Sequence, residues 1–266
     1  MAEQFNANVP SPARVWNYWV GGKDNFQADR AAGDAIREVV PYVATVARLT
    51  RQFLFHAVTL LASEYGVRQF IDIGSGLPTA RNTHEVAQAA APEARILYVD
   101  NDPQVISHAR SLLTGTAEGR VGYLQADLRD TATILAQAAR DLDLSRPVGL
   151  LMIQVLHFIP DADDPRAKVR RLMDALAPGS FLVLVHGASD IQNEVSDETS
   201  ERYNATSPAH ITLRGRQQVA PFFDGLELLG PGLVSGTEWL TPEESGRTTG
   251  ISFGYSGIAR KPEQGG

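Results

Sequence analysis

The chain of 266 residues has no cysteine, no long basic run and no long apolar run. Without cysteine it has no disulfide, no thiolate nucleophile and no cysteine-ligated zinc site. No apolar stretch approaches the roughly 20 residues that a membrane span requires. The chain does not open with a basic segment followed by an apolar run, the pattern of a signal peptide. We therefore expect a soluble, cytoplasmic protein with no membrane partner.

Positive charge is scarce as well. The chain has 24 Lys and Arg residues against 31 Asp and Glu, a formal net charge of −7. An acidic chain without a basic tract is a poor match for the phosphate backbone, so we expect no nucleic-acid partner. The apolar share of 43% is that of an ordinary globular protein, and a chain of this length can bury most of its apolar surface.

The first 66 residues show helical spacing. Ser11-Pro12 is a helix start and Gly21-Gly22 a helix end. From Tyr42 to Tyr65 apolar residues recur three and four positions apart, which predicts a long amphipathic helix that ends before Gly66. We predict two parts, an N-terminal helical cap over residues 1–66 and a core over residues 67–266.

In the core, short apolar runs alternate with segments of helical spacing. This alternation predicts βαβ units and a parallel sheet covered on both faces. Two later runs, Glu227–Val234 and Ile251–Arg260, have no room for a crossover helix between them, and we expect them to pair antiparallel at the end of the sheet. The runs expected to form parallel strands are Gln69–Ile73, Arg95–Val99, Val121–Gln125, Val148–Val155 and Ser180–Val185.

In an open α/β sheet, ligands bind beyond the carboxyl ends of the strands. The first predicted strand leads into Gly74 and Gly76, which allow a tight turn and a close approach of the backbone to a ligand. A dinucleotide fingerprint needs a third glycine where this chain has Thr79. Taken alone, the two glycines fit a ligand loop and a plain strand-to-helix turn equally well.

Carboxylates end the next two predicted strands. Asp100 is placed to accept hydrogen bonds from both hydroxyls of a ribose. Its neighbour Asp102 precedes Pro103 and is explained as a helix N-cap. Two roles for Asp127 are equally well supported. Its carboxylate could accept a hydrogen bond from an adenine amino group, with the amide of Leu128 facing the ring, or it could stabilise a turn.

These strand ends resemble the cofactor motifs of class I methyltransferases that depend on S-adenosylmethionine. Longer stretches are similar to an actinobacterial family of S-adenosyl methyltransferases of unknown substrate, and the similarity covers nearly the whole chain. The stretches are RVWNYWVGGKDN at residues 14–25, FIDIGSGLPT at 70–79, YVDNDP at 98–103 and LHFIPD at 156–161.

The resemblance implies a Rossmann-like α/β fold, with a mostly parallel sheet of seven strands of which one is antiparallel, and an N-terminal helical cap. It also implies S-adenosylmethionine as cofactor, with Asp72 near its amino group and Gln154 near its sulfonium. The cap would cover this cofactor within one chain or meet a second chain, so a homo-oligomer stays open. The cofactor-binding residues expected are Tyr18, Asp72, Gly74, Ser75, Gly76, Asp100, Asn101, Asp127, Leu128 and Gln154.

Methyl transfer needs alignment of the acceptor and, where the acceptor carries a proton, a base. His157 follows the fourth predicted strand and is our candidate base, although packing beside Phe158 explains it slightly better. For His186 we favour a packing role. Asp161, Asp163 and Asp164 lack the spacing of a calcium loop, and we expect a solvated helix start and no metal.

The expected function is S-adenosylmethionine-dependent methyl transfer to a small-molecule acceptor, whose identity and methylated atom the sequence does not give. Two alternatives stay open. A module that binds the cofactor without turnover would keep its affinity for the cofactor and give no product with any acceptor. A nicotinamide-dependent oxidoreductase is disfavoured by the missing third glycine and by Asp72.

Overall fold

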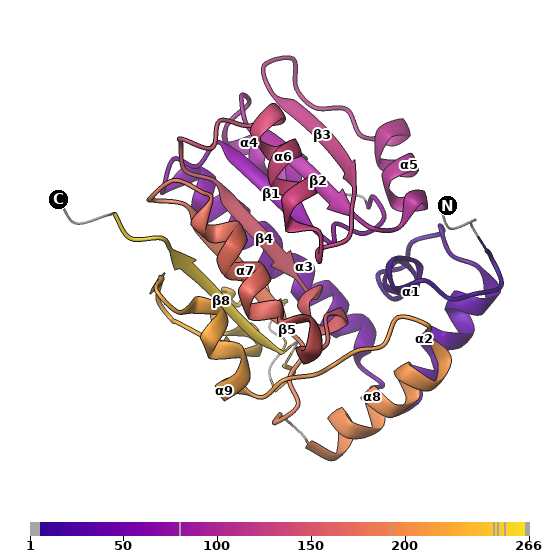
Figure 1. The fold of residues 1–266 in the computed structure, drawn as a ribbon. Helices are drawn as coiled ribbons and strands as arrows, with labels where there is room; N and C mark the ends of the chain where they lie inside the picture. The colour runs from indigo at the N-terminus through magenta and orange to yellow at the C-terminus, as the bar shows by residue number, and fades with distance from the viewer. Residues whose placement is uncertain are drawn as a thin grey trace.

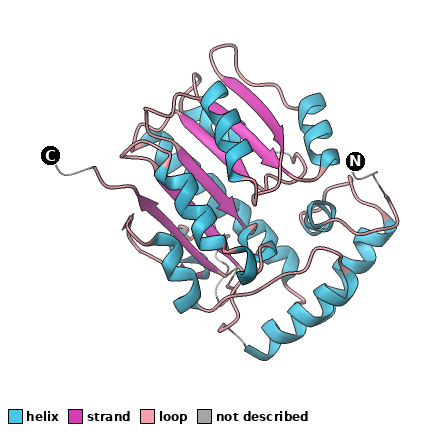
Figure 2. Cartoon of the chain, in the orientation of Figure 1, coloured by secondary structure: helices cyan, strands magenta, loops and turns pink. Residues whose placement is uncertain are grey.

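The computed structural model describes residues 6–79, 81–191, 193–246, 248, 250–252 and 254–263. A central sheet carries helices on both faces, and a group of helices lies beyond one end of the strands (Figures 1 and 2). Within the described ranges, no helix combines the length and apolar character needed to cross a membrane.

The sheet has the order β3-β2-β1-β4-β5-β8-β6, with β7 also paired to β8. The first five strands run parallel, and β8 runs antiparallel to its neighbours β5, β6 and β7. The predicted fold, a mostly parallel sheet with one reversed strand, is confirmed. The strands are β1 (Gln69–Ile73), β2 (Arg95–Asp100), β3 (Arg120–Gln125), β4 (Gly149–Ile153), β5 (Phe181–His186), β6 (Glu227–Leu228), β7 (Val234–Ser235) and β8 (Tyr255–Arg260).

The prediction of a single strand over residues 227–234 is wrong, because the structure has two short strands there, β6 and β7. The described part of the sheet therefore has eight strands, one more than expected. Pro231 lies between the two segments and has no N–H to donate to a strand ladder, so the run does not continue as one strand.

Helices α1, α2 and α8 lie beyond the carboxyl ends of the strands, while most of the others cover the two faces of the sheet (Figure 1). Asp102 and Asp164 cap α5 and α7 as predicted, accepting from the N–H groups of Gln104 and Ala167. The helices are α1 (Pro12–Trp19), α2 (Gln27–Val39), α3 (Val43–Ser63), α4 (Thr83–Ala90), α5 (Pro103–Leu112), α6 (Thr131–Asp141), α7 (Pro165–Asp174), α8 (Asn193–Thr206) and α9 (Arg216–Val219), with 3₁₀ helices η1 (Leu156–Phe158), η2 (Asp161–Asp163), η3 (Ala220–Phe223) and η4 (Gly236–Trp239).

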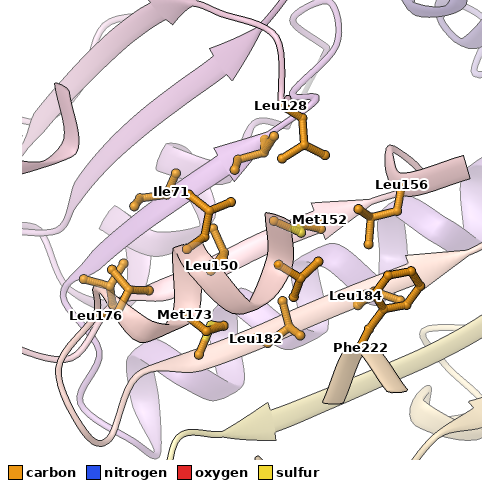
Figure 3. Close-up of a cluster of buried hydrophobic side chains, with 14 of the residues drawn as sticks. Ile71, Leu128, Leu150, Met152, Leu156, Met173, Leu176, Leu182, Leu184 and Phe222 are labelled. Atoms are coloured by element: carbon orange, nitrogen blue, oxygen red, sulfur yellow. The ribbon is translucent and has the colours of Figure 1, made fainter. Parts of the chain in front are cut away.

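Two apolar clusters fill the spaces on either side of the sheet. One lies between the sheet and α6, α7 and η3, and Figure 3 shows part of it, with Leu150 and Leu182 of the sheet near Met173 of α7. The other lies between the sheet and α3 and α4, where Phe53 and Leu61 of α3 are fully buried. Strands β1, β4 and β5 are buried on both faces, which explains their continuous apolar sequences.

Candidate functional site

A cavity of about 1220 Å³ opens at the carboxyl ends of β1 to β4, under α1, α2, α3 and α8. Nine of the ten residues expected to bind a cofactor line it, together with the candidate base His157. The lining set is Asp72, Gly74, Ser75, Gly76, Asp100, Asn101, Asp127, Leu128 and Gln154.

The loop after β1 brings its backbone to the cavity through two glycines in the left-handed region, Gly74 at φ +72° and Gly76 at φ +68°. The N–H of Gly74 donates to the carbonyl of Val99 (2.8 Å). A Cβ atom at Gly74 would lie 2.6 Å from Cγ2 of Val155, whereas at Gly76 it would meet nothing within 4 Å. Gly74 is therefore required by packing, and Gly76 leaves open space beside its backbone.

Asp100 anchors this loop from the end of β2. Its Oδ2 accepts the N–H of Gly76 (2.9 Å) and its Oδ1 accepts the N–H of Asp102 (3.0 Å). Burial raises the pKa of Asp100 to about 6, although both hydrogen bonds oppose the rise. The carboxylate thus fixes the loop and still lines the cavity.

Asp72, near the end of β1, is a second buried carboxylate on the cavity. Its Oδ2 accepts a hydrogen bond from Oγ1 of Thr83 (2.6 Å). Burial raises the pKa of Asp72 to about 6, and the nearby charge of Arg51 acts in the opposite direction. Arg51 comes from α3, lines the cavity and donates to the carbonyl of Arg81. The sequence analysis missed Arg51, because nothing in a helical pattern shows which residue faces a distant strand.

Asp127 lies in the turn after β3 and binds Arg129. Its Oδ1 accepts the backbone N–H of Arg129 (2.8 Å), and the Arg129 guanidinium lies 3.0 Å from its Oδ2. The amide of Asn101 donates to the same Oδ2 at 3.5 Å. The carboxylate therefore holds its own turn and also lines the cavity, so both roles considered for Asp127 are compatible with its position.

Gln154 and His157 reach the cavity from the segment after β4. Gln154 has a left-handed φ of +55°, and its N–H donates to the carbonyl of Val185 (2.9 Å). An ideal Cβ atom at Gly187 would lie 3.8 Å from both Oε1 of Gln154 and Nδ1 of His157. Cδ2 of Leu213 would lie closer still, at 2.6 Å, so Gln154, His157 and Leu213 pack together over Gly187.

His157 packs against Phe158, with ring centroids 4.3 Å apart. Its Nδ1 is buried and has no hydrogen-bond partner among the described residues. Burial lowers the pKa of His157 well below the usual value, and the nearby His186 and Arg214 add to the effect. The imidazole is therefore neutral at neutral pH.

His186 has a different environment, because both of its ring nitrogens are occupied. Nδ1 lies 2.8 Å from the carbonyl of Gly187, and Nε2 lies 2.9 Å from Nη1 of Arg214. An arginine has only N–H donors, so Nε2 accepts and Nδ1 donates. Burial lowers the pKa of His186 to about 4. This geometry agrees with the packing role favoured for His186.

Arg214, which the sequence analysis also missed, holds the segment that carries His157. Its guanidinium donates to the carbonyls of Leu156 and Ile159 and to Oδ1 of Asp161 (3.2, 2.7 and 2.6 Å). Asp161 is 68% exposed at the start of η2, as expected of a solvated helix start, and it also pairs with Arg214. No group of three or more metal-ligating side chains occurs in the described part of the chain.

Tyr18 is the one expected cofactor residue that does not line the cavity. Its hydroxyl donates to Asp34 (2.8 Å), and the guanidinium of Arg37 lies over its ring. The neighbours Asn17 and Trp19 line the cavity. Successive residues of a helix point about 100° apart. The stretch at residues 14–25 therefore reaches the cavity through the residues on either side of Tyr18.

Ser11, at the start of α1, binds the core and does not cap its own helix. Its Oγ donates to Oδ2 of Asp102 (2.7 Å), and no side-chain cap bond forms at this helix start. Arg14 of the same helix is paired with buried Asp29 of α2 and reaches Gln104 of α5. These contacts hold α1 and α2 over the ends of the strands.

The model of a family described as S-adenosyl methyltransferase matches residues 1–262 of the chain. The crystal structure of a DUF574 family protein from Streptomyces avermitilis has 39% sequence identity to the chain and a TM-score of 0.91, and the match covers 96% of this chain and 99% of that one. A protein from Thermobifida fusca described as a methyltransferase candidate has 35% identity and a TM-score of 0.84, with 96% of each chain covered.

A more distant likeness is to the plantazolicin methyltransferase BpumL, solved with SAH and a triazolic desmethylPZN analog. It has 11% identity and a TM-score of 0.51, with 93% of this chain and 95% of that chain covered, and shows a common fold. No curated protein matches the chain.

Proposed function

The chain belongs to the S-adenosyl methyltransferase family, and from that membership we propose an enzyme that methylates a small molecule in the cavity at the strand ends. Its family and fold make it an S-adenosylmethionine-dependent methyltransferase. The observation that carries the proposal is that Asp72, Gly76, Asp100 and His157 come together on one cavity.

The residues at the strand ends fit the parts of S-adenosylmethionine. The open backbone at Gly76 leaves room for the ligand, and Asp100 provides a buried acceptor for the two ribose hydroxyls. Asp72 and Arg51 bring opposite charges to the same cavity, which suits the ammonium and carboxylate of a zwitterion. We assign Asp127 and Leu128 to the adenine, Gln154 to the sulfonium end, and Ser75 and Asn101 to the edge of the site.

When bound, the cofactor supplies an electrophilic methyl group on a positively charged sulfur. The chain supplies alignment and, in our proposal, a base. His157 suits that role because its imidazole is neutral and it lines the same cavity as Gln154. A His157→Ala variant that keeps its fold and cofactor affinity but loses turnover supports the base. A lower melting temperature with normal turnover supports packing.

The shape of the site supports a small acceptor. The cavity lies under α1, α2 and α8, and many of its lining side chains are apolar. The net charge of −7 also disfavours nucleic acid. We propose that α1 and α2 act as the cover of this cavity.

Isothermal titration with S-adenosylhomocysteine, with NADH as the control, tests the cofactor assignment. We expect micromolar binding of the first ligand alone. Asp100→Asn should weaken that binding by about 1–3 kcal/mol, because the ribose hydroxyls lose a charged acceptor. Asp143→Asn is the matched control, since Asp143 lies with Gln69 and Arg95 at the opposite edge of the sheet. Equal affinities of the two variants would remove Asp100 from the site.

Turnover separates the methyltransferase from a module that only holds the cofactor. A silent module would bind S-adenosylhomocysteine and release no product from S-adenosylmethionine across a broad panel of acceptors. The cytoplasmic location and the oligomeric state stay predictions, which cell fractionation and sedimentation would test.

A further inference from the structure

The cavity is larger than one ligand needs. Its volume of about 1220 Å³ exceeds the roughly 300–1000 Å³ of pockets that enclose a single drug-sized molecule. The residues assigned to the cofactor all lie at the strand ends. The remaining space lies under α1, α2, α8 and the segment 208–213, and it is the place for the acceptor.

The walls of this space form a separate apolar cluster, which we call the apolar wall. Its members come from α1, α2, α3, η1, α8 and the segment after α8, and all of them line the cavity. The apolar wall includes Trp19, Ile36, Val43, Phe158, Tyr203 and Ile211. These side chains pack with one another and border the cavity, so the cluster provides an apolar surface for a ligand.

Most of the charged residues that line the cavity lie at the ends of β1, β2 and β3. The lining Asp, Glu, Lys and Arg side chains come from α1, from Arg51 of α3 and from the ends of β1, β2 and β3. The described residues of α2, α8 and the segment 208–213 contribute none, and the titratable His210 there is exposed. A charged ligand group against the apolar wall would lose its hydration without gaining a partner.

Two buried polar atoms on the cavity lack partners. Oγ1 of Thr50 and Nδ1 of His157 have no hydrogen-bond partner among the described residues. Buried polar atoms are usually paired, so the missing partners set Thr50 and His157 apart from the other polar residues that line the cavity.

We propose that the acceptor is an uncharged, largely apolar molecule that carries a hydroxyl group, bound against the apolar wall with its hydroxyl at the imidazole of His157. This inference rests on the proposed methyl transfer and names its substrate class. The hydroxyl oxygen forms a bond to the methyl carbon as the carbon–sulfur bond breaks, and the electron pair of that bond stays on sulfur. The hydroxyl proton passes to His157, which then releases it to solvent.

The test uses 2-naphthol as the probe, with naphthalene-2-carboxylate and 2-naphthylmethylammonium as charged counterparts of the same shape. Each is titrated into protein saturated with S-adenosylhomocysteine, and binding is followed by calorimetry. We expect 2-naphthol to bind at least about tenfold more tightly than either charged probe. Failure to bind S-adenosylhomocysteine would refute the proposed function itself. Binding of S-adenosylhomocysteine with no 2-naphthol binding, or with equal affinity for a charged probe, would overturn this inference alone.

A matched pair of variants in α8, the helix that contributes Tyr203 to the apolar wall, tests the effect of a charge in this part of the cavity. Val195 of α8 lines the cavity, and Val195→Asp and Val195→Asn differ in charge at nearly equal size. We expect the Asp variant to bind 2-naphthol about tenfold more weakly than the Asn variant and to favour the ammonium probe, with S-adenosylhomocysteine affinity unchanged. Ala205→Asp places the same charge on an exposed position of the same helix. Equal effects of Val195→Asp and Ala205→Asp would overturn the inference, and the probe series on the unaltered protein decides it if Val195→Asp does not fold.

Discussion

At Gly74 and Gly76 the backbone takes the same left-handed conformation in different surroundings. An alanine at either position has to adopt a φ near +70°, which costs roughly 1–2 kcal/mol. At Gly74 the new Cβ would also lie 2.6 Å from Val155, whereas at Gly76 it would enter open space. Substitution at Gly74 therefore tests the packing of the fold, whereas substitution at Gly76 tests the space available to a ligand.

We expect Gly74→Ala to lower the free energy of unfolding by about 3 kcal/mol or more, and Gly76→Ala by only about 1–2 kcal/mol. In contrast, Gly76→Ala should weaken S-adenosylhomocysteine binding at least about tenfold, since its methyl group occupies space beside the ligand loop. Urea denaturation and calorimetry measure the two quantities. Equal losses of stability in both variants would contradict the packing role of Gly74.

Because Asp72 and Asp100 are buried carboxylates, we expect pH to act in opposite directions on the stability of the ligand-free protein and on ligand affinity. The pKa values of Asp72 and Asp100 rise from the ordinary 3.8 to about 6, so the folded chain binds more protons than the unfolded chain between these values. Their ionisation therefore destabilises the ligand-free protein as pH rises through this window, and the effect fades as pH falls. The ligand groups assigned to them need ionised carboxylates, so binding should weaken over the same range.

We expect S-adenosylhomocysteine affinity to fall between pH 8 and pH 5, by about tenfold for each carboxylate that becomes protonated. Calorimetry across this range measures the slope, and Asp100→Asn should make it shallower. An affinity that stays constant down to pH 5 would show that neither carboxylate binds the ligand in its ionised form.

At the scale of elements, the sequence predicts what depends on local pattern. The apolar runs predict the parallel strands, and the Asp-Pro pairs predict the caps of α5 and α7. Because parallel strands bring their carboxyl ends to one edge, Asp72, Asp100 and Asp127 could also be placed together in advance. Helix α8 was not found, since its sequence NEVSDETSERYNAT has few apolar residues and it lies along α2 (Figure 1).

Contacts between distant elements explain what the sequence analysis missed at the site. The charge of Arg51 acts on Asp72, and Arg214 donates to the η1 segment, only because the fold brings these distant residues near one another. The same applies to Tyr18, whose hydroxyl has a nearer partner in Asp34 of α2. Residue type alone did not distinguish Tyr18 from its cavity-lining neighbours Asn17 and Trp19.

Arg214 connects the segment before α9 to the turn that carries His157, so its loss should affect both stability and activity. We expect Arg214→Met to lower the free energy of unfolding by about 2–4 kcal/mol, because two backbone carbonyls and Nε2 of His186 lose their donor. Arg214→Lys should restore only part of this, since lysine cannot reproduce the planar fork.

Arg202→Met is the control for this prediction, because Arg202 forms an exposed pair with Glu38 that should be worth less than about 1 kcal/mol. Urea denaturation gives the stabilities, and methyl transfer at saturating cofactor gives the effect on His157. If Arg214→Met is no more destabilising than Arg202→Met, the buried contacts of Arg214 do not support the turn.

At the scale of the whole molecule, the N-terminal helices divide between the cavity and the core. Helices α1 and α2 contact the rest of the chain through the apolar wall and through polar contacts such as Ser11 with Asp102. Helix α3 instead contributes Phe53 and Leu61 to the cluster between the sheet and α4. The cap expected over residues 1–66 therefore combines a cover with a core helix, and this packing favours a boundary before α3.

Two truncations test where that boundary lies. A variant that begins at residue 67 loses the fully buried Leu49, Phe53, Val58 and Leu61, each worth roughly 1.5–3 kcal/mol. This loss is comparable with the whole stability of a domain, about 5–15 kcal/mol, so we expect no folded protein. A variant that begins at residue 43 keeps α3 and should unfold cooperatively, yet bind S-adenosylhomocysteine more weakly because the cover over the strand ends is gone. Circular dichroism melting and calorimetry distinguish the two, and cooperative unfolding of the shorter variant would instead make residues 1–66 one detachable unit.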